Sequence, residues 1–298
     1  MALKIRVECE AGTCARCKVD QLNALSRELS SGTTAVVALI HDGRLFVANV
    51  GDSRALLCRT DPNGVLTVAQ LSADHDLRNE DELLRLAQLG LHIDTLRRGG
   101  RLGNQENTRC LGNYLVKGGY KEVGELRAAT SEPVIAEPEI HGGIQLDDSC
   151  RFLLLMSGGL HKSLQEATGR PTAQLNKEIA HMTVEQFREQ ATLTGVAQAV
   201  VDKVARMHHD TYVSGRLGTA GKRGDITLLV RNFNFPVASQ SHLEHFTATD
   251  TSDTSTDSSS LIHSIEQSKV DPYVDFSEYY RSVERMRLEG TLPPGIDF

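Results

Sequence analysis

Alternating and clustered apolar positions over residues 33–71 organise the first half of the chain. The run Thr33 to Ile40 is rich in β-branched and aliphatic residues, which predicts a strand buried on both faces. Turn residues, several of them glycine, separate it from three more apolar runs, Leu45 to Val50, Ala55 to Cys58 and Val65 to Leu71. The pattern predicts a four-stranded antiparallel meander with Gly51-Asp52-Ser53-Arg54 as an exposed turn in its middle.

Helical spacing of apolar residues predicts four helices in the same region and beyond it. The first covers Gln21 to Leu29, and a later pair covers Thr172 to Glu189 and Leu193 to His209. Asn79 is the expected N-cap of a fourth helix, which ends near Gly90. Its expected apolar face consists of Leu83, Leu84, Leu86 and Ala87.

Three further strands and a flap complete the predicted domain. Phe152 to Met156 predicts a buried strand that leads through Ser157-Gly158-Gly159 into a helix, and Ile226 to Val230 predicts the last strand. Val134 to His141 predicts a strand interrupted by Pro138. The glycine-rich stretch Gly99 to Gly119 matches neither common phosphate-binding signature and predicts a long irregular flap.

The composition changes after the last predicted strand. Every residue from Thr247 to Ser260 except Ala248 is Ser, Thr or Asp, which predicts a solvated linker open to phosphorylation. Asp271 and Pro272 suit the start of a helix. Its expected face has aromatic residues at helical spacing, Tyr273, Phe276 and Tyr280, followed by Val283 and Arg287. This face predicts docking, either onto a partner or back onto the chain's own domain.

The predicted organisation is therefore an α+β domain followed by a linker and a helix. The expected boundaries are an unstructured start over 1–19, the domain over 20–236, a disordered linker over 237–269, the helix over 270–290 and a tail over 291–298.

Composition excludes some function classes. The chain has 298 residues, 40% of them apolar, which is enough for a core of mostly aliphatic side chains. A formal net charge of −7 argues against binding to nucleic acid. We find no run of 18 apolar residues and no apolar leader, so the sequence predicts neither a membrane span nor secretion.

The six cysteines are scattered. Cys9, Cys14 and Cys17 suggest either part of a zinc site or, with better support, three free thiols, because a structural zinc site needs four ligands. Cys58, Cys110 and Cys150 lie near apolar runs and are expected to be small buried side chains. Free thiols without a secretion signal indicate a reducing, cytoplasmic location.

Polar residues near the predicted strand ends are the candidates for chemistry. Asp74 and His75 could serve as acid and base, although capping of nearby backbone is the better interpretation. His208 and His209 are expected to favour the helix C-terminus electrostatically rather than to bind metal. Asp52 is expected to accept hydrogen bonds from turn amides.

Several short motifs together resemble one family. They are SGTTAVVALI, LFVANVGDSRALL, LSADHDLRNEDELLRLAQLG, VIAEPEIH, LLLMSGGL and DITLLV, in that order. Over about Leu22 to Phe235 the chain resembles the metal-dependent protein phosphatase 2C (PPM) family. The resemblance implies a β-sandwich flanked by helices, and for active members two divalent metals held by carboxylates.

The resemblance also implies that this chain lacks the metal ligands. The family's Arg-x-x-Gly-Asp turn reads Arg109 to Asn113, and its Ser-Asp-Gly turn reads Ser157-Gly158-Gly159. Asp225 stands at the family's Asn position, with its side chain expected on the opposite face. The family's early metal-binding loop and first strands have no counterpart, which leaves open a fragment, an incomplete gene model or an isoform. An apolar sheet face or edge is then expected to be open.

Among family members, the chain resembles a catalytically inactive one, a pseudophosphatase, more than it resembles active enzymes. That likeness implies an adaptor without a cofactor. It would bind and activate a MAP kinase kinase kinase through its C-terminal helix, with a stress-activated MAP kinase as a further partner. The implied kinase-binding residues are Tyr273, Val274, Phe276, Tyr279 and Tyr280. The alternatives are an active metal-dependent protein serine/threonine phosphatase and a non-functional truncated product.

Overall fold

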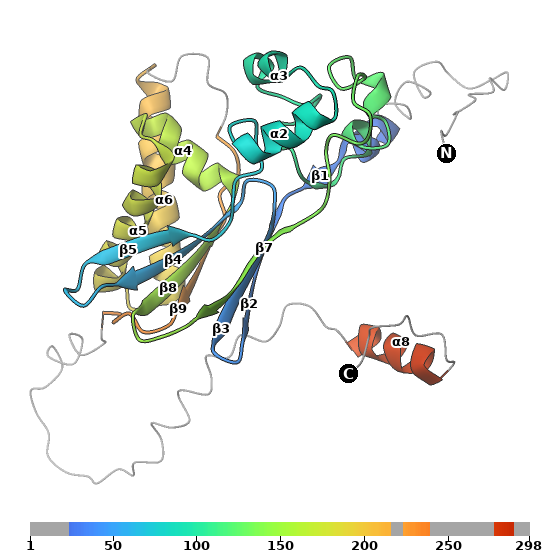
Figure 1. The fold of residues 1–298 in the computed structure, drawn as a ribbon. Helices are drawn as coiled ribbons and strands as arrows, with labels where there is room; N and C mark the ends of the chain where they lie inside the picture. Colours follow the sequence, from blue (N-terminus) through green and yellow to red (C-terminus); the bar gives the residue numbers. More distant parts are fainter. Residues whose placement is uncertain (1–23, 216–222, 239–276, 289–298) are drawn as a thin grey trace, which may run out of the picture. The chain divides into compact units, whose positions relative to one another are not determined.

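The computed structural model describes residues 24–215, 223–238 and 277–288 (Figure 1). The chain divides into two compact units, Met1–His242 and Leu243–Phe298. In the second unit the structure describes one helix, α8 (Ser277–Leu288). The first unit contains the elements described below.

Two antiparallel sheets form the centre of the first unit. The three-stranded sheet has the order β2-β3-β7, with β2 Ala35–His41, β3 Arg44–Val50 and β7 Glu139–Gln145. The four-stranded sheet has the order β5-β4-β8-β9, with β5 Leu66–Gln70, β4 Arg54–Thr60, β8 Cys150–Met156 and β9 Leu228–Asn232. A short pair joins β1 (Gly32–Thr33) to β6 (Leu111–Gly112).

The predicted single meander is wrong, because its four strands are two hairpins that belong to different sheets. The β2-β3 hairpin lies in one sheet and the β4-β5 hairpin in the other. The chain crosses between them at Gly51, whose φ of +108° and close approach to Thr34 leave no space for a side chain. The connection is also buried rather than exposed, since Asp52 retains only 6% of its accessible surface.

Strand β4 explains why the sheets form separate layers. Its apolar residues are buried on both faces, so a layer must cover each side. Ala55 and Leu57 belong to the core shared with the first sheet, together with Leu45 and Val47 of β3. Leu56 and Cys58, which alternate with them along the strand, belong to the core formed with the helices. The result is a sandwich with helices on one outer face.

Three helices cover the four-stranded sheet (Figure 1). They are α4 (Gly158–Thr168), α5 (Thr172–Glu189) and α6 (Leu193–Val213). The predicted bounds of α5 are confirmed, and α6 continues past His209. Phe152 of β8 contacts Phe187 of α5, with ring centroids 5.2 Å apart. None of the helices in the described part of the chain combines the length and apolarity needed to cross a bilayer.

A smaller cluster of helices and loops lies at the end of the sandwich (Figure 1). It contains α2 (Glu80–Gln88), α3 (Ile93–Gly99), and the 3₁₀ turns η1 (Tyr114–Val116) and η2 (Tyr120–Glu122). Asn79 caps α2 as predicted and accepts hydrogen bonds from the N–H groups of Asp81 and Glu82. Leu84, expected in the core, is 60% exposed, so the buried face of α2 is narrower than predicted.

Smaller corrections concern other strand and helix bounds. Helix α3 was not predicted, and β7 begins after Pro138 instead of containing it, because proline cannot donate to a ladder. Residues 24–30 are helical, so the first helix ends one residue later than predicted.

The outer face of the three-stranded sheet has exposed apolar side chains. Val37 of β2, Ala48 of β3 and Ile140 of β7 form one row across the strands. Val37 and Leu39 are each 59% exposed, and Ile140 is 70% exposed. Strand β2 is therefore an edge strand with one open face, not the two-sided buried strand that its composition predicts.

Candidate functional site

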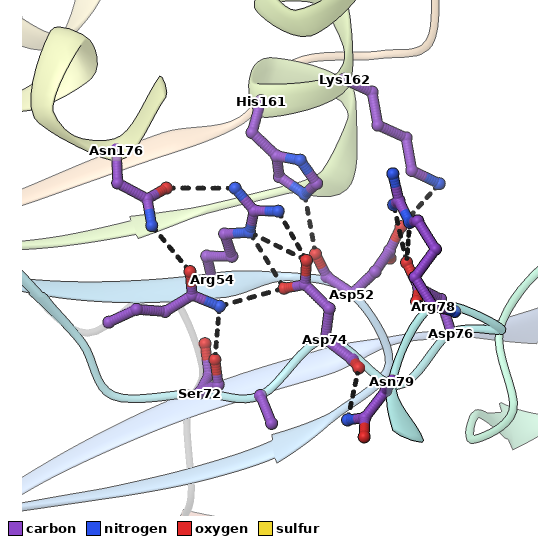
Figure 2. Close-up of polar contacts among 12 residues, drawn as sticks. Asp52, Arg54, Ser72, Asp74, Asp76, Arg78, Asn79, His161, Lys162 and Asn176 are labelled. Atoms are coloured by element: carbon purple, nitrogen blue, oxygen red, sulfur yellow. Dashed lines mark hydrogen bonds and ion pairs between the residues drawn. The ribbon is translucent and has the colours of Figure 1, made fainter. Parts of the chain in front are cut away.

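The connection between the two sheets is held by two buried histidines, His75 and His161. Figure 2 shows His161 above Asp52. The N–H of Gly51 donates to Nδ1 of His75 at 3.0 Å. The Nε2 of His161 in α4 donates to the carbonyl oxygen of Asp52 at 2.9 Å. The Ser53 hydroxyl bonds that of Thr34 at 3.0 Å. These contacts fix the backbone and aim the Asp52 side chain towards α4.

The side chain of Asp52 forms an ion pair with a lysine instead of capping the turn as predicted. The Nζ of Lys162 lies 2.7 Å from Oδ2 of Asp52, and Nδ2 of Asn107 donates to Oδ1 at 3.3 Å. Burial alone would raise the pKa of the Asp52 carboxyl, but the charge and hydrogen bond of Lys162 outweigh burial and lower that pKa. The carboxylate is therefore ionised and already neutralised at neutral pH.

Lys162 also pairs with the flap. Its Nζ lies 3.1 Å from Oε2 of Glu106, so one ammonium group bridges two carboxylates. A pocket of about 340 Å³ adjoins this arrangement. It is lined by Asp52, Asn107, Gly158, Gly159, Lys162, Ser163, Glu166 and Gly224.

Two glycines make room for this arrangement at the start of α4. A Cβ at Gly158 would lie 2.7 Å from Oδ2 of Asp52. A Cβ at Gly159 would lie 2.0 Å from the carbonyl oxygen of Asp225. Any side chain at either position would therefore force the Asp52 carboxylate or the backbone before β9 to move.

A buried arginine adjoins the same turn (Figure 2). Arg54 is 1% exposed and donates to both carboxylate oxygens of Asp74, at 2.9 Å through Nε and 2.5 Å through Nη2. Its Nη1 donates to Oδ1 of Asn176 in α5 at 3.0 Å. The guanidinium thus links β4, the loop after β5 and a covering helix. Asp74 is a structural counter-ion, and this pairing was not predicted from the sequence.

The remaining predicted site residues do not gather around Asp52. Asn113 lies in the flap with a φ of +54°, and its Nδ2 donates to Asn104 and Gln105. Asp225 is exposed and precedes β9. His208 is buried and pairs with Glu166 of α4 at 2.8 Å, so its predicted role at the helix end is wrong. Across the described ranges, no group of three or more His, Cys, Asp or Glu residues has a metal-binding arrangement.

Other predicted residues can be placed only in part. Cys58, Cys110 and Cys150 are buried free thiols, as predicted, and burial raises the pKa of Cys58 to about 12. Cys9, Cys14 and Cys17 lie outside the described residues, as do the predicted linker beyond Ala238 and the predicted kinase-binding residues Tyr273, Val274 and Phe276. The first two residues assigned to the linker instead pack on the domain, where the N–H of Ala238 donates to the carbonyl oxygen of Phe187 at 2.8 Å. Tyr279 and Tyr280 lie in α8, although the structure describes only their backbone.

Lys162 is the residue of this candidate site that sequence reasoning missed. A lysine in an amphipathic helix is usually a solvated charge, and its partner Asp52 is far away in the sequence. Its position in the sequence was the available signal. Lys162 follows a buried strand and two glycines, so it lies at the end of that strand, next to the Gly51-Asp52-Ser53 connection.

Comparisons with known proteins agree with this architecture. Residues 12–209 match the family described as Protein phosphatase 2C. The chain is 28% identical to "TGF-beta-activated kinase 1 and MAP3K7-binding protein 1" of Caenorhabditis elegans, over 70% of this chain and 48% of that protein. It is 32% identical to "Probable protein phosphatase 2C 27" of rice, over 65% of this chain and 52% of that protein.

A serine-threonine phosphatase 2C from Toxoplasma gondii has a related structure, with a TM-score of 0.47 and 18% identity over 74% of this chain and 63% of that one. This likeness is too loose to bear on function. The chain spans about half the length of the two curated relatives. The family match covers most of the sandwich and its helices, and the chain belongs to the protein phosphatase 2C family.

Proposed function

We propose that this chain is a catalytically inactive PP2C-like adaptor that binds and activates a MAP kinase kinase kinase of the TGF-beta-activated type. It would act in stress and cytokine signalling in the cytoplasm. The similarity to the Caenorhabditis elegans protein, whose name states binding to such a kinase, supports the choice of partner. A stress-activated MAP kinase is a further proposed partner, suggested by the same resemblance.

The observation that carries the inactive half of the proposal is the ion pair between Asp52 and Lys162. A PP2C-type reaction needs metal ions that generate hydroxide and bind the phosphoryl group, and hard divalent ions need several converging oxygen ligands. Here the ammonium group of Lys162 pairs with the Asp52 carboxylate, and neutral glycines border the pocket. The residues present do not fit a binuclear metal centre, and we derive no catalytic step through one.

The positions that the family resemblance marks as metal ligands support the same proposal. Gly158 stands where the family has an aspartate, and Asn113 replaces another. A side chain at position 158 would also meet the Asp52 carboxylate, so restoring the aspartate would require Asp52 to leave its partner Lys162.

The C-terminal helix is the proposed kinase-binding element. An isolated helix of this length is marginal in water, so we expect α8 and the residues before it to order fully on the partner. Burying each large aromatic side chain contributes about 1.5–3 kcal/mol, whereas ordering each residue costs about 1–2 kcal/mol. Binding therefore requires well-filled pockets for the main anchors, Phe276 and Tyr280.

Capture of the kinase by the full chain tests the adaptor proposal. We expect Phe276→Ala to lose most kinase binding, because it empties the proposed anchor pocket. Phe298→Ala removes an aromatic residue of the predicted tail and serves as the matched control. Equal kinase capture by wild type and Phe276→Ala would contradict the proposed binding element.

The second candidate function is a metal-dependent protein serine/threonine phosphatase, which the rice relative favours. It predicts manganese-dependent hydrolysis of an aryl phosphate or a phosphopeptide. We expect no such turnover by the purified chain. Hydrolysis by wild type that disappears in Asp52→Asn would establish phosphatase activity. It would contradict the proposal that the adaptor is catalytically inactive.

A further inference from the structure

The ammonium group of Lys162 lies between oxygen atoms from two separate parts of the chain. Asp52 comes from the connection between the sheets, and Glu106 comes from the flap. Their carboxylate oxygens lie 2.7 Å and 3.1 Å from Nζ. Lys162 itself comes from α4, so one cation ties three elements together.

An amide side chain adjoins this pair. Asn107 donates its Nδ2 hydrogen to Asp52, while its own Oδ1 is buried without a hydrogen-bond partner. Two carboxylates are the ligand type that hard divalent cations such as Mg²⁺ and Mn²⁺ prefer. The pocket of about 340 Å³ leaves room for water molecules to complete a coordination shell.

We propose that Lys162 is a tethered cation that takes the place of a divalent metal ion, and that removing its charge opens a Mn²⁺ site on Asp52 and Glu106. This inference deepens the proposed function, because it explains how a PP2C fold satisfies a buried rim carboxylate without metal.

Charge and burial explain why the lysine excludes a metal ion in the wild type. Asp52 is 6% exposed, and a buried carboxylate without a nearby cation is strongly unfavourable. The side chain of Lys162 cannot diffuse away, so its charge is always close to Asp52. A second cation would meet both the repulsion of the ammonium group and a carboxylate oxygen that is already hydrogen-bonded.

The test uses the full chain with Lys162→Gln, which removes the charge, keeps a polar side chain and shortens it by one atom. Without metal, this variant should melt at a lower temperature than wild type. In about 1 mM Mn²⁺ its Tm should rise by roughly 5 °C, because the ion binds only the folded state. The Tm of wild type should not respond to Mn²⁺.

Two further variants isolate the site. Lys203→Gln removes an exposed ion pair of α6 with Glu185 and should show no response to Mn²⁺. Asp52→Asn with Lys162→Gln removes both charges and should fold without metal and show no response. Titration calorimetry with MnCl₂ gives the binding constant directly, without reference to activity.

The outcomes separate this inference from the proposed function. A Lys162→Gln protein that binds no Mn²⁺ at millimolar concentrations, or that stays unfolded with or without the metal, overturns the tethered-cation inference and leaves the adaptor proposal intact. A wild-type chain that binds Mn²⁺ at Asp52 as tightly as the variant also overturns it. Phosphate hydrolysis by wild type would contradict the proposed function instead.

Discussion

The main-chain N–H of Gly51 donates to Nδ1 of His75, so this imidazole must be neutral in the folded protein. Burial is the main cause that lowers the pKa of His75, and the Arg109 guanidinium lowers it further against the opposing charges of Glu82 and Glu139. Burial, followed by the charge of Arg54, also lowers the pKa of His161. Both imidazoles that hold the connection between the sheets therefore resist protonation.

These two histidines should make the protein sensitive to mild acid. Below about pH 6.5 the unfolded chain binds protons that the folded chain excludes, so the free energy of unfolding falls as pH is lowered. The slope is at most about 1.4 kcal/mol per pH unit for each histidine, and their contribution is complete above about pH 6.5. Urea unfolding at several pH values between about 7.5 and 5 measures this slope.

His161→Gln keeps a donor for the Asp52 carbonyl oxygen. Because it removes one titrating group, it should reduce the dependence of the free energy of unfolding on pH by the contribution of one proton. The pKa of Glu82 is lowered from 4.5 to about 2, so its contribution is lost only at more acidic pH and does not overlap this window. A free energy of unfolding that stays constant between about pH 7.5 and 5 would contradict the interpretation.

Glu82 and Glu80 of α2 form a matched pair for a second prediction. Glu82 is 1% exposed, and its carboxylate bonds Arg109 at 2.6 Å and Arg85 at 2.9 Å. Glu82→Gln removes this shared charge and leaves two arginines without their counter-ion. We expect a loss of about 3 kcal/mol, measured as a lower midpoint in urea at unchanged m-value.

Glu80→Gln is the control, because Glu80 pairs with Arg97 on the surface at 2.6 Å. The same substitution should there cost less than about 1 kcal/mol, since exposed ion pairs contribute little. Similar losses in the two variants would show that burial does not decide the strength of these pairs.

The open face of the three-stranded sheet predicts self-association. Leu39 and Ile140 are largely exposed, and among the described strands β2 pairs only with β3. We expect Leu39→Thr combined with Ile140→Thr to reduce concentration-dependent light scattering. The free energy of unfolding should change by less than about 1 kcal/mol, because neither side chain is in the core.

Val47→Thr is the matched control for this face. Val47 lies on the same sheet but is 1% exposed, in the core between the two sheets. It should lower the free energy of unfolding by more than about 1 kcal/mol, because it buries a hydroxyl. Unchanged scattering by the Leu39→Thr and Ile140→Thr variant would rule out this face as the source of association.

Local features of the fold were predictable because each depends on nearby residues. The bounds of α5 follow from helical periodicity, and the capping role of Asn79 follows from its position before three acidic residues. The assignment of hairpins to sheets was not predictable, because consecutive antiparallel strands usually pair. The close contact of Thr34 with Gly51, which excludes a side chain there, is a tertiary contact, so no local sequence pattern predicts it.

The candidate site was predictable only as far as its backbone. Asp52 was singled out from its turn sequence, but its partners Lys162 and Asn107 come from α4 and the flap. Ion pairs between distant segments leave no periodic signal in one sequence. The burial of Asp52, which turns an ordinary turn residue into one that requires a cation, also results from α4 and the flap packing against it.

The passage of the chain from one sheet to the other has a mechanical consequence. Val50 ends β3 in one layer and Arg54 begins β4 in the next, so Asp52, which pairs with Lys162, lies in a joint shared by both layers. Any force or ligand that draws the Asp52 carboxylate out of its place would strain both layers at once. Binding of a ligand at this small pocket would therefore affect the packing of both sheets.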